Sequence, residues 1–170
     1  MRLVLLLFSM IFTIPAGAYD LNAIRLEFYK SVDDAGVANA LFKKLKGIEK
    51  KDALLLAYLG STEAVKAKHA WNPYNKLSLL KAGSKKLEQA VGEDPNNLEI
   101  RFLRFSMEHY LPTFLGSSKH LDEDRKQIVK LIGAEKLGTV DKALLKNIIS
   151  FMKETKRCSS SELAILNKAL

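Results

Sequence analysis

Hydrophobic residues recur every three to four positions along most of this chain, in long segments separated by glycine, proline and short polar stretches. Sustained alternation of apolar and polar residues, which is typical of strands, is nearly absent after the first 18 residues. The pattern therefore predicts an all-α fold of seven to eight helices. The expected helices span residues 20–31, 34–48, 52–70, 73–92, 96–111, 118–132, 141–154 and 160–169.

Capping residues indicate where several of these helices begin and end. We expect Asn72 to accept a backbone N–H at the start of the fourth helix, with Pro73 at the first helical position. Pro95 is expected to start the fifth helix in the same way, after Asp94. Further predicted signals are Gly133 in a left-handed turn that closes the sixth helix, Asp141 as the cap of the seventh, and Ser159 with Glu162 as a capping box before the eighth.

The third expected helix carries a narrow seam of small side chains. They recur at spacings of 4, 3, 4 and 3, at Ala53, Ala57, Gly60, Ala64 and Ala67. A glycine inside a helix costs about 1 kcal/mol relative to alanine, so Gly60 indicates a neighbouring helix that approaches closely. The fourth helix places Gly83 beside its apolar face, and we expect these two helices to form a tight antiparallel hairpin.

This hairpin resembles a tetratricopeptide repeat. Leu59 and Gly60 match the first helix of that repeat, and Gly83, Leu87, Ala90 and Pro95 match the second. The intervening "KHAWNPYNKLSLL" makes the unit longer than the usual repeat. The stretch from Asn72 to Ile128 also resembles a group of small exported bacterial proteins with no established function. Both resemblances imply stacked antiparallel helix hairpins, degenerate and tetratricopeptide-repeat-like, and neither brings catalytic residues.

The first 18 residues have the pattern of a secretory signal peptide. Arg2 is followed by the apolar run "LVLLLFSMIFTIP", and the small residues Ala16 and Ala18 predict cleavage after Ala18. The run is shorter than the roughly 20 residues that a membrane helix needs, so no stable membrane anchor is expected after cleavage. Residues 19–170 are then predicted to form a single domain that is periplasmic or secreted. Its one cysteine, Cys158, excludes an intramolecular disulfide.

The chain is basic, with a formal net charge of +8. Most of the excess comes from lysines on the polar faces of the expected helices. Export argues against nucleic acid as a partner, so a basic adaptor for anionic envelope polymers is one alternative, with Lys81, Lys85 and Lys86 gathered on one face. A solvated surface that keeps the chain soluble is the simpler interpretation, and we favour it.

The segment "NNLEIRFLRFSMEHYL", residues 96–111, has two apolar faces when it is placed on a helix. Leu98, Phe102 and Phe105 form one face, and the second consists of Ile100, Leu103, Met107, Tyr110 and Leu111. We therefore expect a central helix that is packed on both sides. Its polar residues form two thin stripes, one with Arg101, Arg104 and Glu108 and the other with Glu99 and Ser106.

The two arginines of this segment have two interpretations. Their guanidinium groups are suited to bind a carboxylate or phosphate of a ligand with two parallel hydrogen bonds. Alternatively they form salt bridges between helices, because a buried unpaired charge costs several kcal/mol. We favour the salt bridges. The candidate partners within the chain are Glu63, Asp122, Glu123 and Asp124.

The sequence favours a binding function over catalysis. Three histidines, His69, His109 and His120, lack the spacing of a metal site, and no metal or cofactor is expected. We predict an exported, non-enzymatic helical scaffold that binds a protein or peptide partner in the cell envelope. The predicted binding residues are Arg101, Arg104, Tyr58, Asn72, Tyr74 and Lys76. The alternative is an envelope hydrolase that uses Glu108 with His109 or the acidic cluster Asp122–Asp124.

Overall fold

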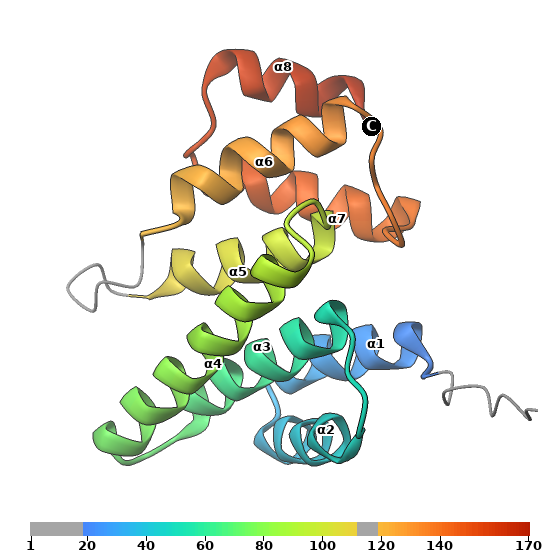
Figure 1. The fold of residues 1–170 in the computed structure, drawn as a ribbon. Helices are drawn as coiled ribbons and strands as arrows, with labels where there is room; N and C mark the ends of the chain where they lie inside the picture. Colours follow the sequence, from blue (N-terminus) through green and yellow to red (C-terminus); the bar gives the residue numbers. More distant parts are fainter. Residues whose placement is uncertain (1–18, 112–118) are drawn as a thin grey trace, which may run out of the picture.

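The computed structural model describes residues 19–111 and 119–170, which form eight α-helices and no strand (Figure 1). The helices are α1 (Leu21–Ser31), α2 (Ala35–Gly47), α3 (Ala53–His69), α4 (Pro73–Glu93), α5 (Leu98–Tyr110), α6 (Leu121–Gly133), α7 (Lys142–Glu154) and α8 (Ser160–Lys168). The predicted all-α class is confirmed. None of these eight helices has the length and hydropathy that a membrane span needs. The predicted leader and its cleavage after Ala18 lie outside the described residues.

Side-chain caps begin several helices as the sequence predicts. The side chain of Asn72 accepts the backbone N–H of Tyr74 at 2.8 Å, and Pro73 occupies the first position of α4. Asp141 caps α7 in the same way, and Ser159 with Glu162 forms the predicted capping box of α8. Each cap satisfies backbone donors that have no partner within the helix.

The predicted start of the fifth helix is wrong. α5 begins at Leu98, because the side chain of Asn97 accepts the backbone N–H groups of the first turn and so caps the helix there. Pro95 lies in the preceding turn instead, where its carbonyl oxygen accepts a hydrogen bond from Arg101.

The predicted left-handed turn at Gly133 is also wrong. Gly133 remains in α6, and the positive φ angle falls on Glu135, at 55°. The turn closes through a hydrogen bond from the N–H of Lys136 to the carbonyl of Leu131. Glycine at position 133 serves packing, since a Cβ atom there would lie 2.9 Å from a methyl carbon of Ile165 in α8.

The α3–α4 hairpin is as tight as the small side chains predict. A Cβ atom built on Gly60 would lie 2.8 Å from the carbonyl oxygen of Gly83, and one built on Gly83 would lie 2.6 Å from that of Gly60. Both distances are shorter than a van der Waals contact. The two glycines therefore allow the backbones of antiparallel helices to touch, which confirms the predicted close approach.

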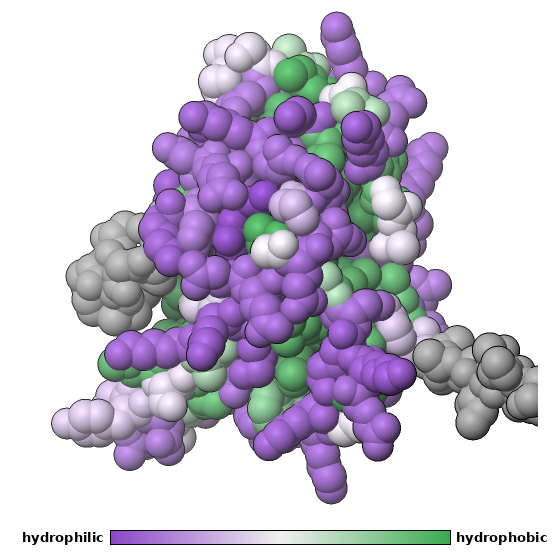
Figure 2. All heavy atoms as spheres, in the orientation of Figure 1, coloured by the Kyte–Doolittle hydropathy of each residue, from purple (hydrophilic) through white to green (hydrophobic). Residues whose placement is uncertain are grey.

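Two hydrophobic clusters form the interior, and α5 contributes to both. Ile100 and Leu103 pack into the first cluster with residues of α1 to α4. Leu98 and Phe105 pack into the second with residues of α6, α7 and α8. Figure 1 shows α5 between these two groups of helices. The predicted packing of α5 on two sides is confirmed, although Tyr110 at its end is exposed. Hydrophilic side chains cover most of the face in Figure 2, and hydrophobic ones reach the surface between them.

Candidate functional site

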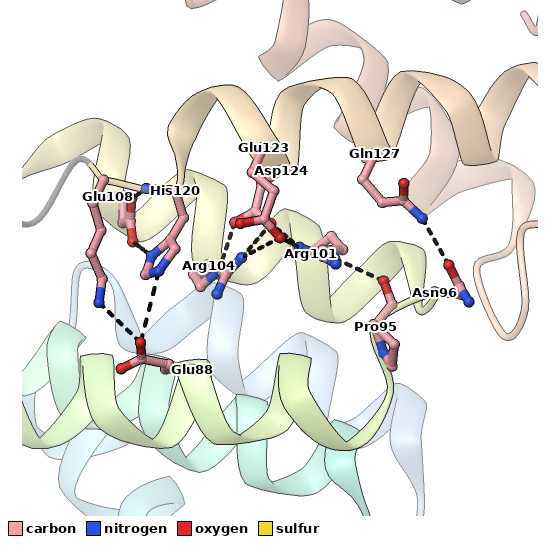
Figure 3. A network of polar contacts seen from close by, with 11 residues as sticks. Glu88, Pro95, Asn96, Arg101, Arg104, Glu108, His120, Glu123, Asp124 and Gln127 are labelled. Carbon is pink, nitrogen blue, oxygen red and sulfur yellow. Dashed lines mark hydrogen bonds and ion pairs between the residues drawn. The ribbon is translucent and has the colours of Figure 1, made fainter.

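The arginine pair of α5 binds carboxylates of the same chain (Figure 3). Nε and Nη2 of Arg104 donate to the two oxygens of Asp124, each at 2.7 Å. Nη1 of Arg101 donates to Asp124 at 2.8 Å and to Glu123 at 2.5 Å. Asp124 is 0% exposed, and both arginines are buried. Of the four carboxylates considered from the sequence, these two are the partners.

The same contacts hold the start of α6 against α5. Glu123 and Asp124 lie in the first turn of α6, where their negative charge also favours the positive end of the helix dipole. The hydrogen bond from Arg101 lowers the pKa of Glu123. The remaining two candidates have other partners: Glu63 binds Lys86 at 2.6 Å, and Asp122 lies 3.6 Å from Arg125.

Glu108 and His109 are adjacent in sequence but have different partners. Glu108 accepts the backbone N–H of His120 at 3.0 Å, and its other oxygen lies 2.6 Å from Nδ1 of the same histidine. The ring of His109 instead accepts a hydrogen bond from Nε of Arg157 at 3.2 Å. Burial and the charge of Arg157 lower the pKa of His109. Glu108 thus stabilises the start of α6, one turn further along the same side of α5 than Arg104 (Figure 3).

A second buried network was not predicted. Glu99 accepts two hydrogen bonds from Arg25, at 2.8 and 2.6 Å, and one from the hydroxyl of Tyr58 at 2.5 Å. These contacts raise the pKa of Arg25, and burial with the charge of Glu99 raises that of Tyr58. Arg25 also donates to the carbonyl of Thr139, so the network joins α1, α3, α5 and the α6–α7 connection.

The six predicted binding residues do not form one surface. Arg101 and Arg104 lie between α5 and α6, and Tyr58 lies in the Glu99 network. Asn72 and Tyr74 are at the exposed turn between α3 and α4. Lys76, also exposed, borders a groove on the other side of α4.

This groove lies between α1, α3, α4 and α5 and has a volume of about 640 Å³. That volume is within the range of roughly 300–1,000 Å³ that is typical of ligand sites. Most of its lining is apolar, and the lining residues are Phe28, Val32, Ser61, Ala64, Val65, Ala67, Lys68, Lys76, Leu80, Leu103, Ser106, Met107, Tyr110 and Leu111. We call this feature the α1–α5 groove.

Two features of the packing create the α1–α5 groove. Among the described residues, the second apolar face of α5 is longer than the helices that cover it: Leu103 is buried, whereas Met107 and Tyr110 are increasingly exposed along one wall. The opposite wall, on α3, has the small side chains Ala64 and Ala67, which leave space beside α5. The seam of small residues was visible in the sequence, but the missing cover over α5 depends on the tertiary arrangement.

Few polar groups line the α1–α5 groove, and they differ in exposure. The hydroxyl of Ser61 is buried, with 3% of the residue exposed, and has no hydrogen-bond partner among the described residues. Lys68 and Lys76 are exposed at the rim. The Lys68 ammonium donates to the carbonyl of Val32 at 2.7 Å and lies 3.2 Å from Asp33. Within the described part of the chain, no cluster of three metal-ligating side chains occurs.

Comparisons with protein-family models, with curated proteins and with solved structures find no match to this chain.

Proposed function

We propose that the chain is an exported, non-enzymatic helical scaffold in the cell envelope, and that it binds a protein or peptide segment in the α1–α5 groove. The observation that carries this proposal is the α1–α5 groove itself, which has a mostly apolar lining, a volume of about 640 Å³ and two lysines at its rim. A mostly apolar groove of this volume with a few polar groups is the usual form of a binding site.

The hairpin geometry supports a repeat-like scaffold. Gly60 and Gly83, which match the tetratricopeptide repeat, lie in contact between α3 and α4, and Leu87 and Ala90 are fully buried. Stacks of such hairpins form concave surfaces that bind peptide segments. We propose that the helices of this chain form a degenerate stack of this kind.

The chemistry of the groove defines its occupant. Met107, Leu80 and Val65 offer apolar contacts, which suit hydrophobic anchor side chains of a bound segment. Lys76 forms no ion pair among the described residues and therefore offers a charge to an acidic residue. We expect a segment with two or three apolar anchors and an acidic residue beside them.

The pairing of the acidic residues supports a scaffold over a hydrolase. Asp124 is fully buried and neutralised by two arginines. Glu108 is hydrogen-bonded at the start of α6 and has His120, rather than His109, as its partner. A general acid or base must reach a substrate within hydrogen-bond distance, whereas Asp124 and Glu108 are buried and hydrogen-bonded to their own partners within the protein.

The proposal is tested by selecting peptides from a random display library against residues 19–170. We expect selected peptides to share apolar anchors flanked by acidic residues. Ser106→Phe places an aromatic ring in the groove at a half-buried position, and we expect it to weaken binding by at least tenfold in fluorescence anisotropy.

Ser150→Phe is the matched control, since Ser150 is an exposed helical serine on α7 outside the groove. It should leave peptide affinity unchanged, and both variants should keep the helical circular dichroism of the wild type. The proposal fails if the selection yields no peptide, or only peptides to which wild type and Ser106→Phe bind equally well.

A further inference from the structure

The turn between α3 and α4 exposes two aromatic side chains that do not serve the fold. Trp71 is fully exposed, and Tyr74 is 83% exposed. All six residues from 71 to 76 are exposed, and Figure 1 shows the turn at the end of the hairpin, away from α6, α7 and α8. Tryptophan is mostly buried in soluble proteins, so the complete exposure of Trp71 at this end of the hairpin indicates an interaction surface.

The helix that follows the turn presents lysines along the same outer face. Tyr74, Ser78, Lys81 and Lys85 recur at spacings of 4, 3 and 4, which places them on one side of α4, and all four are exposed. The stripe is about 16 Å long at 1.5 Å per residue. We call these four residues with Trp71 the α4 outer face.

The charge of this region is one-sided. No acidic residue occurs in the sequence between Glu63 and Glu88, whereas the same stretch contains six lysines. Lys86 binds Glu63 and Lys68 lies near Asp33, but Lys81 and Lys85 form no ion pair with any described residue. The α4 outer face therefore combines aromatic groups at one end with two uncompensated positive charges.

We infer that the α4 outer face docks onto a lipid bilayer that contains anionic headgroups. Tryptophan and tyrosine have an apolar ring and a polar tip, and they are enriched at the boundary between headgroups and acyl chains. Lysines near an anionic leaflet are attracted to it. A projecting turn suits a deformable surface that can close around it, whereas a folded partner would need a matching hollow.

This docking is distinct from peptide binding in the α1–α5 groove, because the two surfaces lie on different sides of α4. Lys76 borders the groove, and the stripe with Lys81 and Lys85 begins about 160° away around the helix. The two activities are therefore separable by mutation, and failure of one does not bear on the other.

Trp71 is the only tryptophan of the chain, so tryptophan emission, excited selectively over tyrosine, reports on this turn alone. The experiment uses residues 19–170, which contain every helix that the structure describes. We expect vesicles of phosphatidylcholine with one quarter phosphatidylglycerol to shift the emission to shorter wavelength, and pure phosphatidylcholine to give a much smaller shift. The shift should decline steeply with added salt, because the charges are exposed.

Lys81→Gln with Lys85→Gln should weaken vesicle binding by about 25-fold, since each lysine near an anionic surface contributes about fivefold. The matched control is Lys142→Gln with Lys146→Gln, which removes the same charge at the same i, i+4 spacing from the exposed face of α7. We expect little change there. Trp71→Ala, followed by co-sedimentation with vesicles, should also weaken binding.

Four results would each overturn the inference. These are no emission shift with anionic vesicles, an equal loss in both lysine pairs, the same shift with inorganic phosphate alone, and a shift that appears without vesicles as the protein concentration rises. The third would indicate a free anion and the fourth a second copy of the chain.

Discussion

Replacing Asp124 with asparagine removes the buried negative charge that pairs with two buried arginines. Asp124 accepts three hydrogen bonds of 2.7–2.8 Å and is 0% exposed. Removing one partner of a buried ion pair costs about 3–5 kcal/mol. Asparagine keeps one acceptor oxygen and Glu123 remains nearby, so we expect a loss of about 3 kcal/mol in the free energy of unfolding, at the lower end of that range.

Urea unfolding followed by circular dichroism measures this loss. With a slope of about 2 kcal/mol per molar urea, the midpoint should fall by about 1.5 M without a change in slope. Asp122→Asn is the matched control two residues away, because Asp122 is 85% exposed and lies 3.6 Å from Arg125. It should cost less than about 0.5 kcal/mol. Equal midpoints for the two variants would refute the structural role of Asp124.

A third variant separates the loss of packing from the loss of charge. Arg101→Met, Arg104→Met and Asp124→Leu together remove the three buried charges between α5 and α6. Glu123 loses its arginine partners but stays solvated, because its side chain is 56% exposed. Replacing a buried ionic cluster by apolar residues of similar size is often neutral or stabilising. We expect this triple variant to unfold within about 1 kcal/mol of the wild type, well above Asp124→Asn.

Three further predictions concern packing, a buried hydroxyl and a titrating ring. Gly60→Ala should lower the free energy of unfolding by about 2 kcal/mol, because the added Cβ atom would lie 2.8 Å from the carbonyl oxygen of Gly83. Gly92→Ala should raise it by about 0.5–1 kcal/mol, because a Cβ atom there has nothing within 4 Å and alanine favours the helix. Urea unfolding measures both changes. Ser61→Ala should raise the free energy of unfolding of the unliganded protein by about 1 kcal/mol, since the hydroxyl is buried without a hydrogen-bond partner among the described residues. A loss of stability by calorimetry would contradict this. The pKa of His109 should lie below 6.5 by NMR titration, and Arg157→Gln should return it only part of the way, as burial is the larger cause. The unfolded chain then takes up the proton first, so the stability from neutral His109 is present above about pH 6.5 and is lost as the pH falls through the lower pKa of the folded state; an ordinary pKa in the wild type would contradict this.

Features that depend on local spacing could be predicted from the sequence. The two apolar faces of α5 follow from helical periodicity and place Leu98 and Phe105 in one cluster and Ile100 in the other. Gly60 indicated the close contact with α4 because a glycine inside a helix is otherwise unfavourable. The position of Arg101 and Arg104 on one polar stripe of α5 indicated salt bridges between helices, and four carboxylates of the sequence were candidate partners.

Features that depend on distant contacts could not be predicted. Arg25 and Glu99 are 74 positions apart, and nothing in the spacing of α1 indicates which helix it faces. Among the described residues, the α1–α5 groove arises because the helices that cover α5 end near Met107, which is a property of packing rather than of the α5 sequence. The start of α5 was misplaced because both Pro95 and Asn97 are suitable at a helix start, and only the side-chain cap of Asn97 forms.

The central claim is that binding occurs in the α1–α5 groove, while Arg101 and Arg104 serve the fold. The most direct measurement is the affinity of a groove-selected peptide, by fluorescence anisotropy, for Ser106→Phe and for the triple variant Arg101→Met, Arg104→Met and Asp124→Leu. We predict that Ser106→Phe loses at least tenfold in affinity and that the triple variant stays within about twofold of the wild type. Full affinity in Ser106→Phe, with a large loss in a folded triple variant, would contradict the claim and assign binding to the two arginines.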